Sequence, residues 1–185
     1  MIFFTGTGVN LCYMESNCLD KEMIINTELG AFGSDKCFDF RTKWDHQVDK
    51  HSINAGQQWF EKMVSGLYLG EIVRTIVADL THEGVFEPAL FAPFDNPNSF
   101  STSFISRVEL DAADSLSFEN TRAVLNEMDI TGASLADCAS LHLICSRISR
   151  RSAHLTSAAI TCLLHRMDRP HTVIGVDGSV YRCHP

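Results

Sequence analysis

The segment that most constrains the fold is residues 3–10, FFTGTGVN, a short apolar run that leads into a glycine turn. A strand that ends in a tight glycine loop is typical of the interior of an α/β fold. Residues 171–176 form a second, β-branched run, which closes on Asp177-Gly178 near the other end of the chain. We predict that both of these strands are buried. Because buried strands need neighbours on both sides, we expect this chain to be a piece of a larger fold.

Between these two runs the pattern becomes mostly helical. The strongest helix signal begins at Ser134, where Asp137 can complete a capping box. Its predicted apolar face consists of Leu135, Cys138, Leu141, Cys145, Ile148, Leu155, Ala159, Cys162 and Leu163. Strands are predicted over residues 11–14 and 23–25, helices over 55–81 (interrupted at 65–66) and 117–128, and a loop with at most a short helical turn over 84–101. Strands at both ends with helices between them indicate the α/β class.

Composition and charge exclude some functions. The formal net charge is −8, and the one basic cluster, Arg147, Arg150 and Arg151, is interrupted by serines, so nothing favours a nucleic-acid partner. The seven cysteines have no spacing typical of a zinc site or redox pair, which favours reduced thiols over a disulfide framework. No apolar run approaches the ~20 residues of a membrane span, so we expect no membrane segment and a cytoplasmic location.

Three glycine turns could bring backbone N–H groups close to an anion such as a phosphate. They lie at residues 6–8, 30–33 and 177–179. Each turn taken singly is a weak signal, because most glycine turns only reverse the chain.

Two carboxylates lie among apolar neighbours, Glu28 in a glycine-rich loop and Glu61 after Trp59-Phe60 on a helix. A carboxylate can accept hydrogen bonds from adjacent hydroxyls, so this pair with the amide of Asn10 is suited to holding a sugar. The alternatives are a helix-dipole partner for Glu28 and a solvated glutamate for Glu61. His142, His154 and His165 are interpreted as helix-face residues, and no metal site is predicted.

The order of these motifs resembles the hexokinase and glucokinase family over nearly the whole chain. The motifs that carry the resemblance are GTGVNLCYME (6–15), INTELGAFG (25–33), QWFEKMVSG (58–66) with YLGE (68–71), and GVDGSVY (175–181) with the final His184-Pro185. Four long motifs in family order make a specific match.

The resemblance implies a two-domain, actin-like fold built on ribonuclease-H-like α/β cores. It also implies transfer of the γ-phosphoryl group of MgATP to the 6-hydroxyl of glucose or a related hexose, feeding glycolysis. Residues 1–185 are then a fragment of the large domain, incomplete at both ends, with the small domain absent. The family's general base is an aspartate upstream of the second phosphate loop, expected before Met1, so no catalytic residue is assigned and the isolated chain is expected to be inactive.

The resemblance also assigns binding residues. Asn10, Glu28 and Glu61 match the family's sugar contacts. The positions that match its nucleotide contacts are Thr7, Gly8, Gly66, Leu67, Thr102, Ser103, Phe104, Ile105, Ser106, Asp177, Gly178, Ser179, Val180 and Tyr181.

Three departures from the family pattern keep other functions open. Leu29 stands where the family usually has tryptophan, Leu67 stands where some members have lysine or methionine, and the stretch between Glu15 and Asn26 is shorter than in the family. The alternatives are a sugar-binding or regulatory module without catalysis and a structural remnant that binds no ligand.

Overall fold

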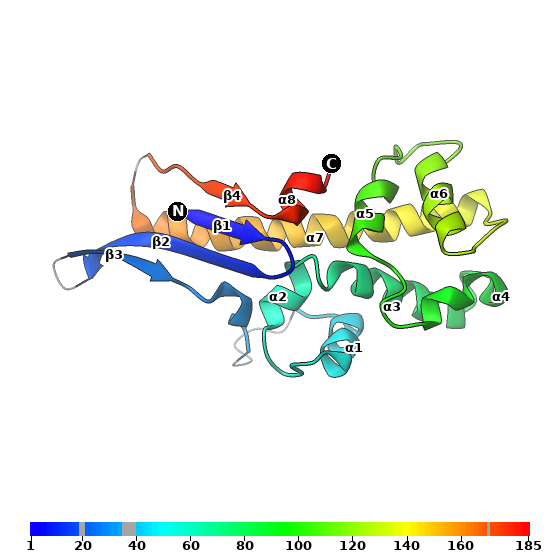
Figure 1. The fold of residues 1–185 in the computed structure, drawn as a ribbon, viewed down its shortest axis with the longest axis horizontal. Helices are drawn as coiled ribbons and strands as arrows, with labels where there is room; N and C mark the ends of the chain where they lie inside the picture. Colours follow the sequence, from blue (N-terminus) through cyan, green and yellow to red (C-terminus); the bar gives the residue numbers. More distant parts are fainter. Residues whose placement is uncertain (19–20, 35–39, 170) are drawn as a thin grey trace.

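A four-stranded sheet joins the two ends of the chain. The computed structural model describes residues 1–18, 21–34, 40–169 and 171–185. The strands are β1 (Ile2–Thr5), β2 (Val9–Cys18), β3 (Lys21–Asn26) and β4 (Gly175–Asp177), in the order β3-β2-β1-β4 (Figure 1). Strand β1 is antiparallel to β2 and parallel to β4, so Phe3 faces Leu11 on one side and Val176 on the other.

The prediction that both terminal strands are buried is correct for only one face of β1. Phe3 is 1% exposed and Thr5 is 7% exposed, whereas Ile2 and Phe4 on the opposite face are each 46% exposed. Strand β4 is the last strand of the described sheet, and Gly175 is exposed. The difference arises because successive side chains of a strand point to opposite faces, and the packing partners of Phe3 lie on one of them.

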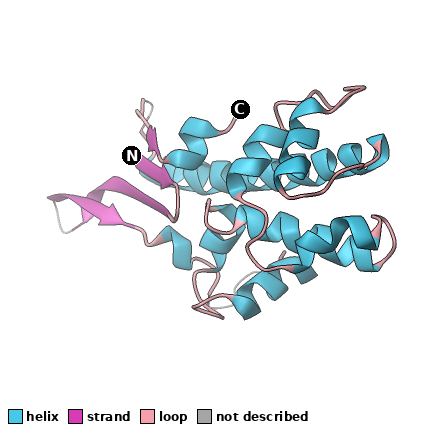
Figure 2. Cartoon of the chain, turned by 45° about the vertical axis from the view of Figure 1, so that its right-hand side comes forward, coloured by secondary structure: helices cyan, strands magenta, loops and turns pink. Residues whose placement is uncertain are grey.

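Helices make up most of the remaining chain (Figure 2). They are α1 (Lys43–His51), α2 (Trp59–Val64), α3 (Leu69–His82), α4 (Pro88–Phe91), α5 (Thr102–Val108), α6 (Glu119–Glu127), α7 (Leu135–Met167) and α8 (Ser179–Cys183), with 3-10 turns η1 (Leu29–Ala31) and η2 (Ala92–Asp95). Helix α7 runs along most of the molecule, from the helical end to the sheet (Figure 1). One core lies among α3, α5, α6 and α7, and a second lies between the sheet, α2 and α7.

The capping box that begins α7 is confirmed, since the side chains of Ser134 and Asp137 each accept a hydrogen bond from the other's backbone. Most of the predicted apolar face is confirmed as well. Cys138, Leu141, Cys145 and Ile148 are buried, and Leu155, Ala159 and Leu163 pack partly against the sheet-side core. The predictions for Leu135 and Cys162 are wrong, because both side chains are exposed. Leu135 lies in the first turn of the helix, and the sheet-side half of α7 is only partly covered.

Several local predictions need correction. Helix α1 was not predicted, and the helix expected from residue 55 begins at Trp59, although the break at Ser65-Gly66 is confirmed. The loop with at most a short helical turn expected over residues 84–101 contains the four-residue α4, as predicted, and also the 3-10 turn η2, which was not; together they place buried phenylalanine rings against one another. The extended run over residues 171–176 contributes only the start of β4, and Asp177-Gly178 leads into helix α8.

Cys12, Cys138, Cys145, Cys162 and Cys183 are free thiols, of which Cys138 and Cys145 are buried while Cys162 and Cys183 are exposed. Cys37 lies outside the described residues. Among the residues that the structure describes, no helix is both long and apolar enough to cross a membrane.

Candidate functional site

Three glycine-containing turns meet at the end of β1. The backbone N–H of Gly66 donates to the carbonyl oxygen of Gly6 at 2.7 Å, and a Cβ on Gly66 would lie only 2.8 Å from that oxygen. Gly178 has φ of +119°, and its Cβ would lie 2.1 Å from the carbonyl oxygen of Thr5. These positions therefore require glycine. The sequence predicted three glycine turns, at residues 6–8, 30–33 and 177–179. The first and the last of them come together here, whereas Gly30 lies near Gly8 at the other end of the first turn, where both glycines are close to Glu61.

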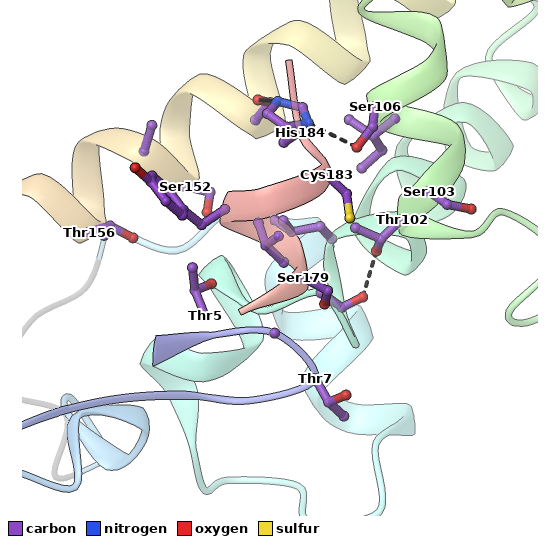
Figure 3. A pocket seen from close by; sticks show the side chains of 18 of the residues that line it. Thr5, Thr7, Thr102, Ser103, Ser106, Ser152, Thr156, Ser179, Cys183 and His184 are labelled. Carbon is purple, nitrogen blue, oxygen red and sulfur yellow. Dashed lines mark hydrogen bonds between the residues drawn. The ribbon is translucent and has the colours of Figure 1, made fainter. Parts of the chain in front are cut away.

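A cavity of about 740 Å³ opens beside these turns. Its walls are the turn after β1, the start of α5, one face of α7, and α8 (Figure 3). Side-chain hydroxyls are frequent in the lining: Thr5, Thr7, Ser101, Thr102, Ser103, Ser106, Ser149, Ser152, Thr156 and Ser179. Among the described residues, no lysine or arginine lines the cavity. An anionic ligand would therefore be held by hydroxyls and backbone N–H groups.

Most of the predicted nucleotide residues lie on this cavity. They are Thr7, Gly66, Leu67, Thr102, Ser103, Ile105, Ser106, Ser179, Val180 and Tyr181. Thr102 also ties two walls together, because its hydroxyl donates to the carbonyl oxygen of Gly66 at 2.7 Å and accepts from the N–H of Gly70 at 2.8 Å. Leu67 is 53% exposed, so it adds apolar surface at the position where some family members offer a charge.

Four predicted nucleotide residues are not part of the cavity lining. Gly8 lies against the carboxylate of Glu61, and Phe104 contacts the ring of Phe100. The carboxylate of Asp177 accepts from the N–H of Gly178 and pairs with Arg182 at 2.8 Å. These four residues are neighbours of lining residues in the chain but do not line the cavity themselves.

Sequence reasoning missed part of the lining. Ser149, Ser152 and Thr156 of α7 face the cavity, as does His184, which directly follows α8. The α7 residues recur at three- and four-residue steps, the spacing of one helix face. A search for a stripe of small hydroxyl residues on that helix could have found them.

The predicted sugar residues form a second cluster, at the ends of β2 and β3. The side-chain amide of Asn10 donates to Asn26 Oδ1 at 2.8 Å, and the amide of Asn26 donates to Glu28 Oε1 at 2.5 Å. The side-chain oxygen of Asn10 accepts from the backbone N–H groups of Leu11 and Leu29. Asn26 was not predicted as a site residue, yet it links the two that were.

Glu28 has an unusual backbone conformation for a residue that is not glycine. Its φ is +50°, and it precedes η1 without making a side-chain capping bond. The helix-dipole interpretation of Glu28 therefore gains no support from its contacts. A left-handed residue of this kind costs free energy and is often found at functional sites.

Glu61 approaches the cluster from the first turn of α2. Its Oε2 accepts from the backbone N–H of Val9 at 3.1 Å. A Cβ on Gly8 would lie 2.7 Å from this oxygen, and a Cβ on Gly30 would lie 3.3 Å from it. The carboxylate is partly buried and hydrogen-bonded, so Glu61 is not an ordinary solvated glutamate. Gly8 is needed to admit this carboxylate, whereas a Cβ on Gly30 would first meet Oε1 of Gln58, at 2.5 Å.

The departure at Leu29 is accommodated by packing. Leu29 is partly buried and lies against the sheet-side core. The support behind Glu28 is therefore apolar, as it would be with the larger tryptophan.

The histidines on α7 mostly match their predicted role. His142 is 7% exposed, and its Nε2 lies 2.9 Å from the carbonyl oxygen of Asp111, while His154 and His165 are exposed. Among the described residues, no group of three or more histidine, cysteine, aspartate or glutamate side chains could hold a metal ion.

Comparison with known proteins agrees with this architecture. A family model described as hexokinase matches residues 1–185. Hexokinase-1 of Rattus norvegicus is 38% identical over 195 residues, which cover 97% of this chain and 21% of that protein. Hexokinase-2 of Homo sapiens is 37% identical with the same coverage. The solved structure of hexokinase from Schistosoma mansoni complexed with glucose matches with a TM-score of 0.89 and 34% identity, over 99% of this chain and 43% of that one.

These matches show that the fold is that of an actin-like sugar kinase. The chain belongs to the hexokinase family. It spans about a fifth of the length of the curated relatives that it matches.

Proposed function

We propose that the protein containing this chain is a hexokinase, which transfers the γ-phosphoryl group of MgATP to the 6-hydroxyl of glucose or a related hexose. One observation carries the proposal. The cluster around Asn10, Glu28 and Glu61 and the hydroxyl-lined cavity lie on two sides of the same turn, because Thr7 lines the cavity while Gly8 contacts Glu61. Phosphoryl transfer needs a donor and an acceptor held next to each other.

The first cluster has the chemistry of a hexose site. Two carboxylates can accept hydrogen bonds from sugar hydroxyls, while an asparagine amide can both donate and accept. Glu61 is held by the N–H of Val9, and Glu28 is held by Asn26. We propose that Asn10, Glu28 and Glu61 bind the sugar and that their hydrogen bonds fix the carboxylates before it arrives.

The cavity has the chemistry of a nucleotide site. Hydroxyls of Thr7, Ser103 and Ser179 can donate to phosphate or ribose oxygens, whereas the hydroxyl of Thr102, which already donates to Gly66, holds two walls of the cavity together. The glycine turns allow close approach of a ligand to the backbone. Its volume of about 740 Å³ is within the usual range of small-molecule sites. Mg²⁺ would bind mainly through the phosphates of the nucleotide, as it usually does.

The transfer step is proposed for the protein as a whole. No residue of this chain is assigned as the general base, and the family places that aspartate in a segment before the glycine turn of residues 6–8. The contribution of this chain is to position the two substrates and to fix the groups that contact them.

The experiment titrates glucose and MgATP into the parent protein and into the variant Glu28→Gln/Glu61→Gln, with glucose-dependent ADP release as the activity assay. We expect the double variant to lose glucose binding, while Glu87→Gln, a change at an exposed glutamate, binds like the parent. Glucose binding that survives the double change would refute the sugar site. Glucose binding without ADP release by the full-length protein would favour the sugar-binding or regulatory module.

A further inference from the structure

His184 connects three elements that wall the cavity. It directly follows α8, and its Nδ1 lies 3.0 Å from the hydroxyl of Ser106 on α5 (Figure 3). Its Nε2 lies 2.6 Å from a carboxylate oxygen of Glu109, at the end of α5, and 2.5 Å from the hydroxyl of Ser149 on α7. The His184 side chain is 24% exposed and that of Glu109 is 14% exposed, so the contacts are largely shielded from water.

The proton positions in this cluster follow from the carboxylate. Burial alone would raise the pKa of Glu109, but hydrogen bonds from His184 and Ser149 outweigh burial and hold that pKa below its ordinary value. Glu109 is therefore ionised at neutral pH and can only accept hydrogen bonds. Nε2 of His184 must then carry a proton, which leaves Nδ1 to bond the hydroxyl of Ser106.

Helix α8 depends on contacts at its ends. It is a single turn of five residues with no buried side chain, although Val180 packs partly against the helical core. An isolated turn of this length is unstable in water. At its start, the backbone of Gly178 packs closely against the carbonyl group of Thr5. At its end, the His184 ring contacts the side chains of Glu109, Ser149 and Ser106.

We infer that His184 is a positioning residue for the nucleotide. It ties α8, which carries Ser179 to Tyr181, to α5, which carries Thr102 to Ser106, and it orients the hydroxyl of Ser106 on the cavity wall. This inference rests on the proposed nucleotide site. It does not depend on the sugar cluster, whose contacts lie around β2, β3 and α2.

The test compares MgATP and glucose affinities, measured by calorimetry, in the parent and in His184→Phe, a ring of similar size without nitrogen. We expect at least a tenfold loss of MgATP affinity and a glucose affinity within twofold of the parent. His184→Gln keeps a donor for Glu109, so it should fall between the parent and His184→Phe. The control is His82→Gln, because His82 also pairs with a carboxylate, that of Asp95, but is 70% exposed and is not part of the cavity lining.

The outcomes separate this inference from the proposed function. Equal MgATP affinity in the parent and His184→Phe would overturn the inference alone. Equal losses of MgATP and glucose affinity would also overturn it, since they would indicate a general structural role. A parent that binds glucose but not MgATP would refute the nucleotide half of the proposed function and the inference with it. If His184→Phe fails to fold, His184→Gln and Ser149→Ala provide the same comparison, with the same selective loss of MgATP affinity expected.

Discussion

Gly8→Ala is expected to disturb the proposed sugar site without disrupting the fold. A Cβ on Gly8 would lie 2.7 Å from Oε2 of Glu61, about 0.7 Å short of the 3.4 Å at which ordinary contact begins. The obstructing atom is the end of a side chain, so the carboxylate can retreat while the backbone stays in place. The φ of Gly8 is not in the left-handed region, so alanine is compatible with the local backbone.

Displacement of the Glu61 carboxylate should lower both glucose affinity and stability, by amounts that can be estimated from the hydrogen bond it loses. The hydrogen bond from the N–H of Val9 to Glu61 is already 3.1 Å long, near the limit for an N–H donor, so a shift of this size breaks it. If glucose depends on the same carboxylate position, loss of a hydrogen bond to a charged group corresponds to about 1.5–3 kcal/mol, or roughly 10- to 100-fold in affinity. The unpaired N–H costs about 1 kcal/mol of stability, which lowers the melting temperature by roughly 2–4 °C.

The assay is glucose titration by calorimetry together with thermal unfolding followed by circular dichroism. Gly175→Ala is the matched control, because its Cβ would meet nothing within 4 Å. It should change neither measurement. A Gly8→Ala variant that binds glucose as tightly as the control would refute the assignment of Glu61 to the sugar. A much larger fall in melting temperature would instead show that the carboxylate cannot retreat.

Two further predictions concern the proposed nucleotide cavity and the stability of the fold. In Gly66→Ala the new Cβ would meet the carbonyl oxygen of Gly6 at 2.8 Å; because this obstacle is backbone, we expect a loss of about 1–3 kcal/mol in unfolding free energy and a larger loss of affinity for MgATP than for glucose. A normal melting temperature would contradict this. Asp45→Asn removes one partner of a buried, bidentate pair with Arg151, which should cost about 3–5 kcal/mol in urea unfolding. Burial would raise the pKa of Asp45, but bonds from Arg151 and Thr42 outweigh it and lower that pKa. The parent should therefore lose this stability as the pH falls below 3.8, the ordinary pKa of an aspartate. The Asp45→Asn variant should lose less stability over the same pH range. Identical pH dependence in the two proteins would refute the stabilising role of the Asp45–Arg151 pair.

Local patterns predicted the parts of the fold that local interactions determine. The strand and glycine turn at residues 3–10 and the helix that begins at Ser134 are both recognisable within a few residues. Helix α1 was missed because its apolar face is short, with Val48 in the core and Trp44 packed against it, although Thr42 and Asp45 form a capping box at its start. Its main anchor is an ion pair between Asp45 and Arg151, 106 positions apart, and no short window of sequence contains it.

The sequence motifs named candidate members of the site but not the contacts between them. The family motifs indicated Asn10, Glu28 and Glu61, whereas the link through Asn26 depends on the register that places residue 26 opposite Cys12. That register is a property of the paired strands and not of either motif alone. His184 was visible as the end of a motif, but its partners come from α5 and α7 and meet only in the folded chain.

The turn between β1 and β2 explains why two glycines, Gly8 and Gly66, occur where they do. Gly8 is required by the carboxylate of Glu61 in the proposed sugar site, and Gly66 is required by the backbone of Gly6 beside the proposed nucleotide cavity. Helix α2 has Glu61 in its first turn and leads directly into Ser65-Gly66 at its end, so one short helix reaches both sides. A movement of α2 would therefore shift Glu61 and Gly66 together. Substitutions that loosen α2, unlike Gly8→Ala or His184→Phe, should weaken glucose and MgATP binding in parallel.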